Sequence, residues 1–254
     1  MPFLLQGSTS VAKSKYKRIL LKLSGETFCK PGGFGIEGEA LESISQRIAQ
    51  VCKLGSEIAI VVGGGNFLRG ETFSKNSHIP RNTADYMGML ATVINACALQ
   101  EMLEKLGQPT RVCSAIEVAA ICEPFIRRRC IKHLEGGRVV ILAGGTGNPF
   151  FSTDTCAALR ASELDADLLI KATKVDGVYS DDPKKNPKAT LYDELTYTEV
   201  LHKNLRVMDH AAISLCKENA IPVIVLNIFK NGNITKALCG EKVGTLIQDK
   251  GSGI

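Results

Sequence analysis

Short runs of consecutive apolar residues alternate along the chain with longer stretches of mixed polarity. Strands that are buried on both faces give unbroken apolar runs, so this alternation predicts a mainly parallel sheet with helices on both sides. The apolar runs place strands at residues 18–23, 58–62, 139–143, 168–170 and 222–226. The stretches between them place helices at residues 40–54, 83–106, 124–134, 153–164, 196–202 and 209–219. The predicted fold class is α/β.

Local signals support several of these boundaries. Thr196 and Glu199 have the spacing of a capping box at the start of a helix. Gly55 and Gly107 directly follow two predicted helices, where glycine commonly ends a helix. Residues 174–189 are rich in turn-forming residues, so we expect an exposed excursion that could include a short hairpin.

The chain length of 254 residues suits either one large α/β domain or two small ones. No internal repeat or low-complexity linker marks a boundary between domains. We therefore expect a loose N-terminal extension at residues 1–15 and a single domain at residues 16–254. Within that domain we expect two functional halves, at about 16–165 and about 166–254.

Composition and charge exclude several classes of protein. No apolar run approaches the roughly 18 residues that a membrane span needs, and the N-terminus lacks the order of a secretory signal. The nine cysteines are odd in number and scattered, and the four histidines are unclustered. We therefore expect reduced thiols in a cytoplasmic protein, with no structural metal. The net charge of +5 does not call for nucleic-acid binding.

The densest basic run is Arg127-Arg128-Arg129, which we interpret as the solvated face of a helix. A regulatory nucleotide site is the less favoured interpretation.

Glycine-rich loops follow three of the apolar runs, with the sequences LSGE (23–26), GGGNFLRG (63–70) and GGTGNPFFSTD (144–154). In parallel sheets the carboxyl ends of the strands form the ligand crevice, and glycine lets backbone N–H groups approach a phosphate. The loops therefore predict an anion site, although glycine is also the ordinary turn residue. None of them has the pattern of a P-loop or of a dinucleotide-binding loop.

Lys22 and Lys171 each lie within or just after a strongly apolar run, where an unpaired ammonium group is costly. One such lysine could extend to solvent from a strand end. Two of them beside phosphate loops favour charge neutralisation during phosphoryl transfer. Asp154 and Asp209 start predicted helices and could be helix caps, or could orient the lysines or hold Mg²⁺.

Residues 173–183 combine Thr173, Tyr179 and Asp182 in a turn-rich segment. The segment could be an ordinary surface hairpin, or it could bind an adenine and its ribose.

A further signal comes from seven stretches of sequence, namely YKRILLKLSGE, VVGGGNFLRG, ADYMGMLATVINA, GGTGNPFFSTDTCAALRASELDADLLIKATKVDGVYSDDP, LTYTEVL, VMDHAA and GEKVGTLI. Together they resemble the bacterial uridylate kinases (UMP kinases), which belong to the amino-acid kinase family. The resemblance extends from about residue 16 to residue 247, and the long central stretch is its most specific part.

The resemblance implies transfer of the γ-phosphoryl group of ATP to UMP, with Mg²⁺, to give UDP and ADP in pyrimidine nucleotide biosynthesis. It also implies an αβα sandwich, with a central mainly parallel sheet, that assembles as a homohexamer.

The resemblance assigns residues to three groups. For UMP they are Gly64, Asp85 and the loop Thr146, Gly147, Asn148, Pro149, Phe150, Phe151, Ser152 and Thr153, with Asp85 on the ribose and the two Phe as a wall of the pocket. For ATP they are Lys22, Leu23, Ser24, Gly25, Gly65 and Arg69 at the phosphates, with Thr173, Tyr179 and Asp182 near the adenosine. For catalysis they are Lys22, Lys171, Asp154, Asp209 and Arg69, the two acids organising the lysines and the metal.

Regulation is also implied by the resemblance, with UTP as an inhibitor at the UMP site and GTP as an activator. Related proteins often carry a basic residue at the position of Gln100 and a histidine at that of Glu104, on a helix expected at the subunit interface. Both basic groups are missing here, which weighs against GTP activation, although Arg111 and the loop at 30–35 match.

Two other functions compete with this one. A kinase of carboxylate or carbamate substrates on the same fold should lack the GTGNPFF pattern and the surroundings of Asp85. A non-catalytic sensor of pyrimidine nucleotides has no need of the transfer residues, which are all present here, namely Lys22, Lys171, Asp154 and Asp209.

Overall fold

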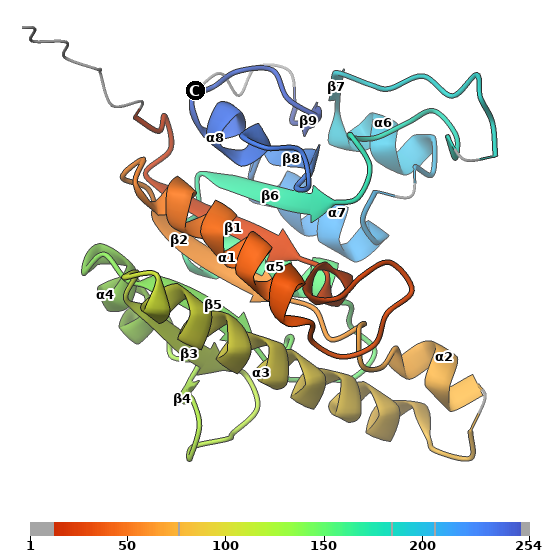
Figure 1. Cartoon of the computed structure of the whole chain (residues 1–254). Helices are drawn as coiled ribbons and strands as arrows, with labels where there is room; N and C mark the ends of the chain where they lie inside the picture. Colours follow the sequence, from red (N-terminus) through yellow and green to blue (C-terminus); the bar gives the residue numbers. More distant parts are fainter. Residues whose placement is uncertain (1–12, 76, 184, 206, 250–254) are drawn as a thin grey trace, which may run out of the picture.

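The computed structural model describes residues 13–75, 77–183, 185–205 and 207–249. Within these ranges one sheet has the strand order β4-β3-β5-β2-β1-β6-β8-β9-β7 (Figure 1). Its strands are β1 (Arg18–Leu23), β2 (Glu57–Val62), β3 (Thr110–Ser114), β4 (Glu123–Pro124), β5 (Val139–Ala143), β6 (Leu168–Thr173), β7 (Glu194–Leu195), β8 (Val223–Asn227) and β9 (Thr245–Ile247). The paired strands are parallel except for β8 and β9, which are antiparallel. The predicted mainly parallel sheet is confirmed.

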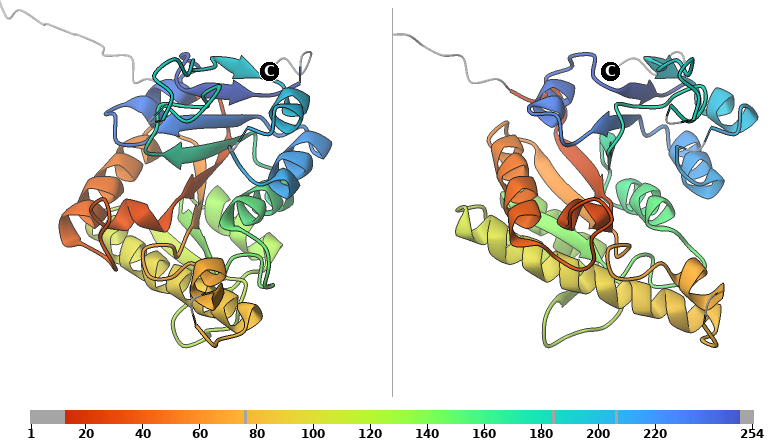
Figure 2. Two further views of the ribbon diagram at one scale, coloured as in Figure 1. Left: turned by 90° about the vertical axis from the view of Figure 1, so that its right-hand side faces the viewer. Right: turned by 45° about the vertical axis from the view of Figure 1, so that its right-hand side comes forward.

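Helices cover both faces of this sheet, which gives three layers (Figure 2). One face carries α1 (Gly38–Cys52), α3 (Arg81–Lys105) and α8 (Asn233–Leu238). The other carries α4 (Arg127–Glu135), α5 (Thr153–Glu163), α6 (Tyr197–His202) and α7 (His210–Glu218). Two short elements follow strand ends, the 3-10 helix η1 (Gly25–Phe28) and the helix α2 (Gly70–Lys75). The α/β sandwich implied by the resemblance is confirmed.

The central strand β1 shows how the sequence produces these layers. Side chains alternate between the two faces of a strand, so an apolar run supplies both cores. Ile19, Leu21 and Leu23 pack under α1 and α3, whereas Leu20 packs under α5. Lys22, two residues after Leu20, lies on the same face of the sheet as Leu20, near the carboxyl end of the strand.

All five predicted strands are present, and β6 continues beyond the predicted end to include Lys171 and Thr173. Four strands were not predicted, β3, β4, β7 and β9. Strand β3 has only two apolar residues, Val112 and Cys113, and the other three strands have only two or three residues each. Their pairing partners, rather than a local apolar pattern, stabilise these short strands.

The six predicted helices are present, with one wrong start. Residues 123–124 pair with the end of β3, so α4 begins at Arg127 rather than at Pro124. The residue before a proline favours extended backbone, which suits a strand at Glu123. The capping box of Thr196 and Glu199 is confirmed, as are the left-handed glycines that end α1 and α3, Gly55 (φ 85°) and Gly107 (φ 81°).

The turn-rich excursion after β6 is exposed along most of its described length. Tyr179 and Leu191 form an isolated antiparallel bridge, and Ser180 N–H donates to Thr190 O at 2.9 Å. Instead of the short hairpin that the sequence could include, the described part of this segment has one isolated β-bridge.

Of the expected N-terminal extension, residues 1–12 lie outside the described residues. Ser14 and Lys15 donate backbone hydrogen bonds to Leu54 O and Leu238 O, at 3.2 and 2.9 Å. The arginine run at 127–129 is exposed on α4, as predicted. Among the described helices, none is both long enough and apolar enough to cross a membrane.

Candidate active site

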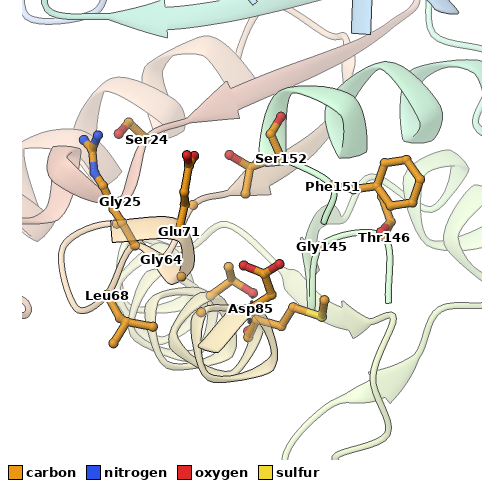
Figure 3. Close-up of a pocket in the computed structure, with 18 of the residues that line it drawn as sticks. Ser24, Gly25, Gly64, Leu68, Glu71, Asp85, Gly145, Thr146, Phe151 and Ser152 are labelled. Carbon is orange, nitrogen blue, oxygen red and sulfur yellow. Dashed lines mark hydrogen bonds between the residues drawn. The ribbon is translucent and has the colours of Figure 1, made fainter. Parts of the chain in front are cut away.

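Strands β5, β2 and β1 are neighbours in the sheet, so the three glycine-rich loops that follow them meet at one edge. The loops and the start of α3 enclose a cavity of about 370 Å³ (Figure 3). Predicted residues that line it are Lys22, Ser24, Gly25, Gly64, Gly65, Arg69, Asp85, Thr146, Asn148, Phe151, Ser152 and Thr153. The predicted grouping of the three loops is therefore present in the structure.

Glycine is required where two of these loops approach other backbone. A Cβ atom added at Gly25 would lie 2.6 Å from the backbone nitrogen of Gly65. One added at Gly64 would lie 2.6 Å from the carbonyl oxygen of Gly88 on α3. These distances are far below van der Waals contact, so a side chain at either position would push the loops apart and reshape the cavity.

The two predicted lysines lie side by side on adjacent strands, because Lys22 of β1 and Lys171 of β6 are in register. Asp154, in the first turn of α5, joins them. Its Oδ1 lies 2.8 Å from Lys22 Nζ, off the axis of a well-formed hydrogen bond, and its Oδ2 accepts from Lys171 Nζ at 2.7 Å. Of the two acids expected to orient the lysines, Asp154 alone therefore pairs with both of them.

These three side chains are largely buried, and their protonation reflects it. Burial disfavours the charged form of Asp154, but the ammonium groups of Lys22 and Lys171 outweigh that cost and hold its pKa below the usual range. Burial lowers the pKa of Lys171 below its ordinary value, and Asp154 offsets only part of this effect.

Asp209 is the N-cap of α7, where its carboxylate accepts from Ala212 N–H at 2.8 Å. It also accepts from the hydroxyl groups of Ser152 and Thr155, the latter at 2.8 Å. Its carboxylate thus joins the start of α7 to the start of α5, which carries Asp154. The helix-cap interpretation of this residue is confirmed, and a role in organising the lysines or the metal stays a prediction.

Arg69 lines the cavity from the second loop, and Glu26 belongs to the first loop. Arg69 pairs with Glu26, and the other oxygen of Glu26 lies 3.3 Å from Lys174 Nζ. Both contacts lower the pKa of Glu26 despite its partial burial. Glu26, in the first loop, therefore holds two cationic side chains, those of Arg69 and Lys174.

Asp85 lies in the second turn of α3 and faces the cavity (Figure 3). Its carboxylate accepts from Arg81 Nε at 2.8 and 2.9 Å and from Phe150 N–H at 2.8 Å. Phe150 has a left-handed backbone (φ 71°), and its ring is 68% exposed. The structure therefore places Phe151, but not Phe150, on the cavity wall.

The remaining predicted residues lie outside the cavity. Lys171, Asp154 and Asp209 line a second, open depression on the α7 side. Leu23 is fully buried, so it can offer only backbone groups to a ligand. Gly147 and Pro149 are in the third loop but do not line the cavity. Thr173 ends β6, and Tyr179 and Asp182 follow it.

Comparison with known proteins identifies the family. The amino acid kinase family model matches residues 17–227, most of the chain. The chain belongs to this family.

Individual members of the amino acid kinase family are close to this chain. It is 55% identical over 239 residues to a chloroplastic uridylate kinase of Arabidopsis thaliana, covering 94% of this chain and 70% of that protein. The structure of a UMP kinase from Bacillus anthracis matches with a TM-score of 0.89 and 39% identity, over 92% of this chain and 97% of that one. A UMP kinase from Ureaplasma parvum matches with a TM-score of 0.86 and 37% identity, over 92% and 99% of the two chains. The resemblance found in the sequence is confirmed and extends to a plant protein.

Sequence reasoning missed the buried pair that braces the second loop of this amino acid kinase. Asn66 and Asn95 exchange side-chain hydrogen bonds of 2.7 and 3.0 Å. Asn95 also donates to Gly63 O at 2.7 Å, and Asn66 to Gly35 O at 2.8 Å. The pair ties the glycine loop to α3, and only the fold brings the two residues together.

The third loop is likewise held from both faces of the sheet. Thr92 of α3 accepts from Gly144 N–H at 2.7 Å. On the other face, Arg160 of α5 donates to Gly145 O at 3.5 Å and stacks 3.7 Å from the ring centre of Phe125. A polar residue in an amphipathic helix gives no local signal of such a contact.

Proposed function

We propose that this protein is a UMP kinase, which transfers the γ-phosphoryl group of ATP to a phosphate oxygen of UMP and releases ADP and UDP. The observation that carries the proposal is the contact of Lys22 and Lys171 with the single carboxylate of Asp154, at the strand ends beside the cavity. Phosphoryl transfer needs positioning and neutralisation of charge more than covalent chemistry by the protein. Two ammonium groups held in a largely buried site supply that neutralisation.

The two substrates occupy different parts of this edge. UMP takes the cavity, with its ribose at Asp85 and its base along residues 146–153, in the half of the chain before about residue 165. The ATP phosphates take the loops that contain Ser24, Gly65 and Arg69. The adenosine lies along the excursion after β6, in the second half.

Mg²⁺ enters with ATP in this account. Within the described residues, no group of three or more His, Cys, Asp or Glu side chains is placed to hold a metal ion. Asp154 is also occupied by two lysines. A metal bound chiefly by phosphates and water fits such a site, since Mg²⁺ commonly enters proteins on a nucleotide. When bound, it neutralises charge on the phosphates.

The competing functions fit the site less well. A sensor needs no pair of buried lysines beside its pocket. A kinase of small carboxylates needs no cavity that extends from Lys22 to Asp85 and Phe151. The relatives reported above are named as uridylate or UMP kinases, which supports the nucleotide substrate.

Self-association as a homohexamer is a further part of the proposal. Helix α3 exposes Tyr86, Leu90 and Ile94 at 44%, 50% and 51%. These residues recur every four positions, so they form one apolar stripe on the helix. A stripe of this kind on a soluble chain suits an interface between copies.

Regulation by nucleotides also remains a proposal. UTP carries the same base and ribose as UMP and would compete for the cavity. GTP activation is disfavoured, because Gln100 accepts from Val112 N–H and Glu104 pairs with Arg111 at 3.0 Å. Arg111, the matching basic residue, is thereby partly neutralised within the chain.

The cytoplasmic location also stays a prediction. All nine cysteines lie within the described residues and are free, which suits a reducing compartment. The Arabidopsis relative is named as chloroplastic, so a chloroplast is the other candidate. Fluorescence microscopy of the tagged full chain in its own cells distinguishes the two.

Release of ADP from Mg·ATP tests the proposed reaction, with UMP, CMP, AMP, GMP, aspartate, glutamate and carbamate offered one at a time. Turnover that is selective for UMP is expected. Turnover with a carboxylate or carbamate alone would show an acid kinase, and binding of UMP without turnover would show a sensor.

A further inference from the structure

Arg81 is a charged residue at the rim of the cavity to which no role has yet been given. It lies one turn before Asp85 on α3, and its Nε donates to both carboxylate oxygens, at 2.8 and 2.9 Å. Pairs at this spacing on an exposed helix contribute little to stability. A functional role for Arg81 can therefore be inferred only if this pair differs from an ordinary exposed ion pair.

The surroundings of Asp85 differ from those of a surface pair. Its side chain is only 13% exposed, while Arg81 is 37% exposed. A Cβ atom added at Gly70 would lie 2.2 Å from Asp85 Oδ1 and 3.1 Å from backbone of the same helix. The carboxylate is thus confined by the chain on one side and by Arg81 on another, and it opens to the cavity.

A second donor connects this carboxylate to the loop that borders the cavity. Phe150 N–H donates to Asp85 Oδ2 at 2.8 Å, from a left-handed backbone that a residue other than glycine seldom adopts. The guanidinium group of Arg81 lies 5.9 Å from the centre of the Phe150 ring, within cation–π range. Arg81 therefore contacts both the carboxylate and the loop residue that shares it.

We propose that Arg81 is a positioning residue that sets the preference for a ribonucleotide over a 2′-deoxyribonucleotide. The inference rests on the proposed function, in which Asp85 accepts the ribose hydroxyl groups. A carboxylate has about four acceptor sites, and the three contacts from Arg81 and Phe150 leave about one for a ribose hydroxyl group, the 2′-hydroxyl in this proposal. By holding both oxygens, Arg81 fixes the direction in which the remaining lone pair faces the cavity.

The test compares UMP with 2′-deoxy-UMP as substrates of the full chain carrying Arg81→Gln, Arg81→Lys or Asp85→Asn. Arg81→Gln is expected to raise the KM for UMP about tenfold, the scale of a hydrogen bond to a charged group. The KM for 2′-deoxy-UMP should change much less, so that the preference between the two substrates largely disappears. The KM for ATP should stay unchanged, and Arg81→Lys should restore only part of the preference.

Arg127→Gln is the matched control, because Arg127, on α4 rather than α3, forms an exposed ion pair with Asp165, which follows α5. It should leave both KM values and their ratio unchanged. Two results for Arg81→Gln would overturn the inference. One is a lower melting temperature with both KM values unchanged, and the other is an equal rise in the KM for UMP and for 2′-deoxy-UMP. The second result would indicate a contact with a group that both substrates share.

Failure of the proposed function gives a separate outcome. If the unaltered chain did not phosphorylate UMP, calorimetric binding of UMP and 2′-deoxy-UMP would replace the kinetic comparison. A preference for UMP that Arg81→Gln abolishes would still support the role of Arg81. Equal binding of the two nucleotides by the unaltered chain would overturn it.

Discussion

Lys22 and Lys171 lie in register on neighbouring strands, and both depend on Asp154 to compensate for their burial. Removing either ammonium group leaves the developing charge of the transferred phosphoryl group under-compensated. Lys22→Ala and Lys171→Ala should each lower kcat by more than about a hundredfold, the scale of losing one preorganised donor. Steady-state ADP release measures this, with Lys132→Ala, an exposed lysine on α4, as the control. Near-normal kcat in both variants would remove the lysines from the mechanism.

The pH dependence of kcat follows from the same three residues. Burial lowers the pKa of Lys171 below its ordinary 10.5, so its charge is lost, and kcat falls, as pH rises through that lowered pKa. Asp154 raises the pKa of Lys171, so Asp154→Asn should move the alkaline fall in residual kcat to lower pH. Profiles of kcat against pH for both proteins, each normalised to its maximum, test the direction. An alkaline limb that moves to higher pH would contradict this account.

The lowered pKa of Asp154 also fixes the sign of its contribution to stability. A carboxyl group whose pKa is depressed by folding stabilises the protein above its unfolded pKa of about 3.9. That contribution is lost as pH falls through the lower folded pKa. Asp154→Asn should therefore make the stability less dependent on pH below about 3.9, as urea unfolding at several acidic pH values can show. An unchanged pH dependence would mean that the pairing does not stabilise the fold.

At the scale of elements, helix α3 holds two glycine loops through buried polar contacts. Asn95→Ala would leave Asn66 Oδ1 and Gly63 O without this donor, at a cost of about 1–3 kcal/mol in the free energy of unfolding. Asn66→Ala should cost a similar amount, and the double variant should cost less than the sum because the partners are shared. Urea unfolding of the single and double variants measures the coupling, with exposed Gln46→Ala as a control. Strictly additive effects would show that the two side chains act independently.

The elements also show where sequence reasoning succeeded and where it could not. Buried central strands such as β1, β2 and β5 have continuous apolar runs, so their positions and the loops after them were predictable. Strand β3 has no such run because only Val112 and Cys113 of its five residues are apolar, and β9 has only three residues. The contacts of Asn95 and Arg160 with distant residues, and that of Arg81 with the Phe150 ring, leave no local pattern in the sequence. The pair of Arg81 with Asp85 has helical i, i+4 spacing and is the one local contact among them.

At the scale of the whole molecule, the single sheet brings together residues separated by more than a hundred positions, such as Lys22 and Lys171. The apolar stripe of α3 then predicts self-association. Leu90→Glu combined with Ile94→Glu should reduce the assembly to smaller species, because charges would be buried at an interface between copies. Light scattering after gel filtration measures the mass, and Ile121→Glu, an exposed apolar residue outside α3, serves as the comparison. An unchanged mass would place the interface elsewhere.

The central claim is that the cavity and the paired lysines transfer phosphate to UMP. The most direct test incubates the protein with ATP labelled at its γ-phosphate, Mg²⁺ and UMP, and then separates the nucleotide products. The account predicts that the label appears in the β-phosphate of UDP, and that Lys171→Ala nearly abolishes this transfer. Label found only in inorganic phosphate, or left in ATP while UMP is bound, would contradict it.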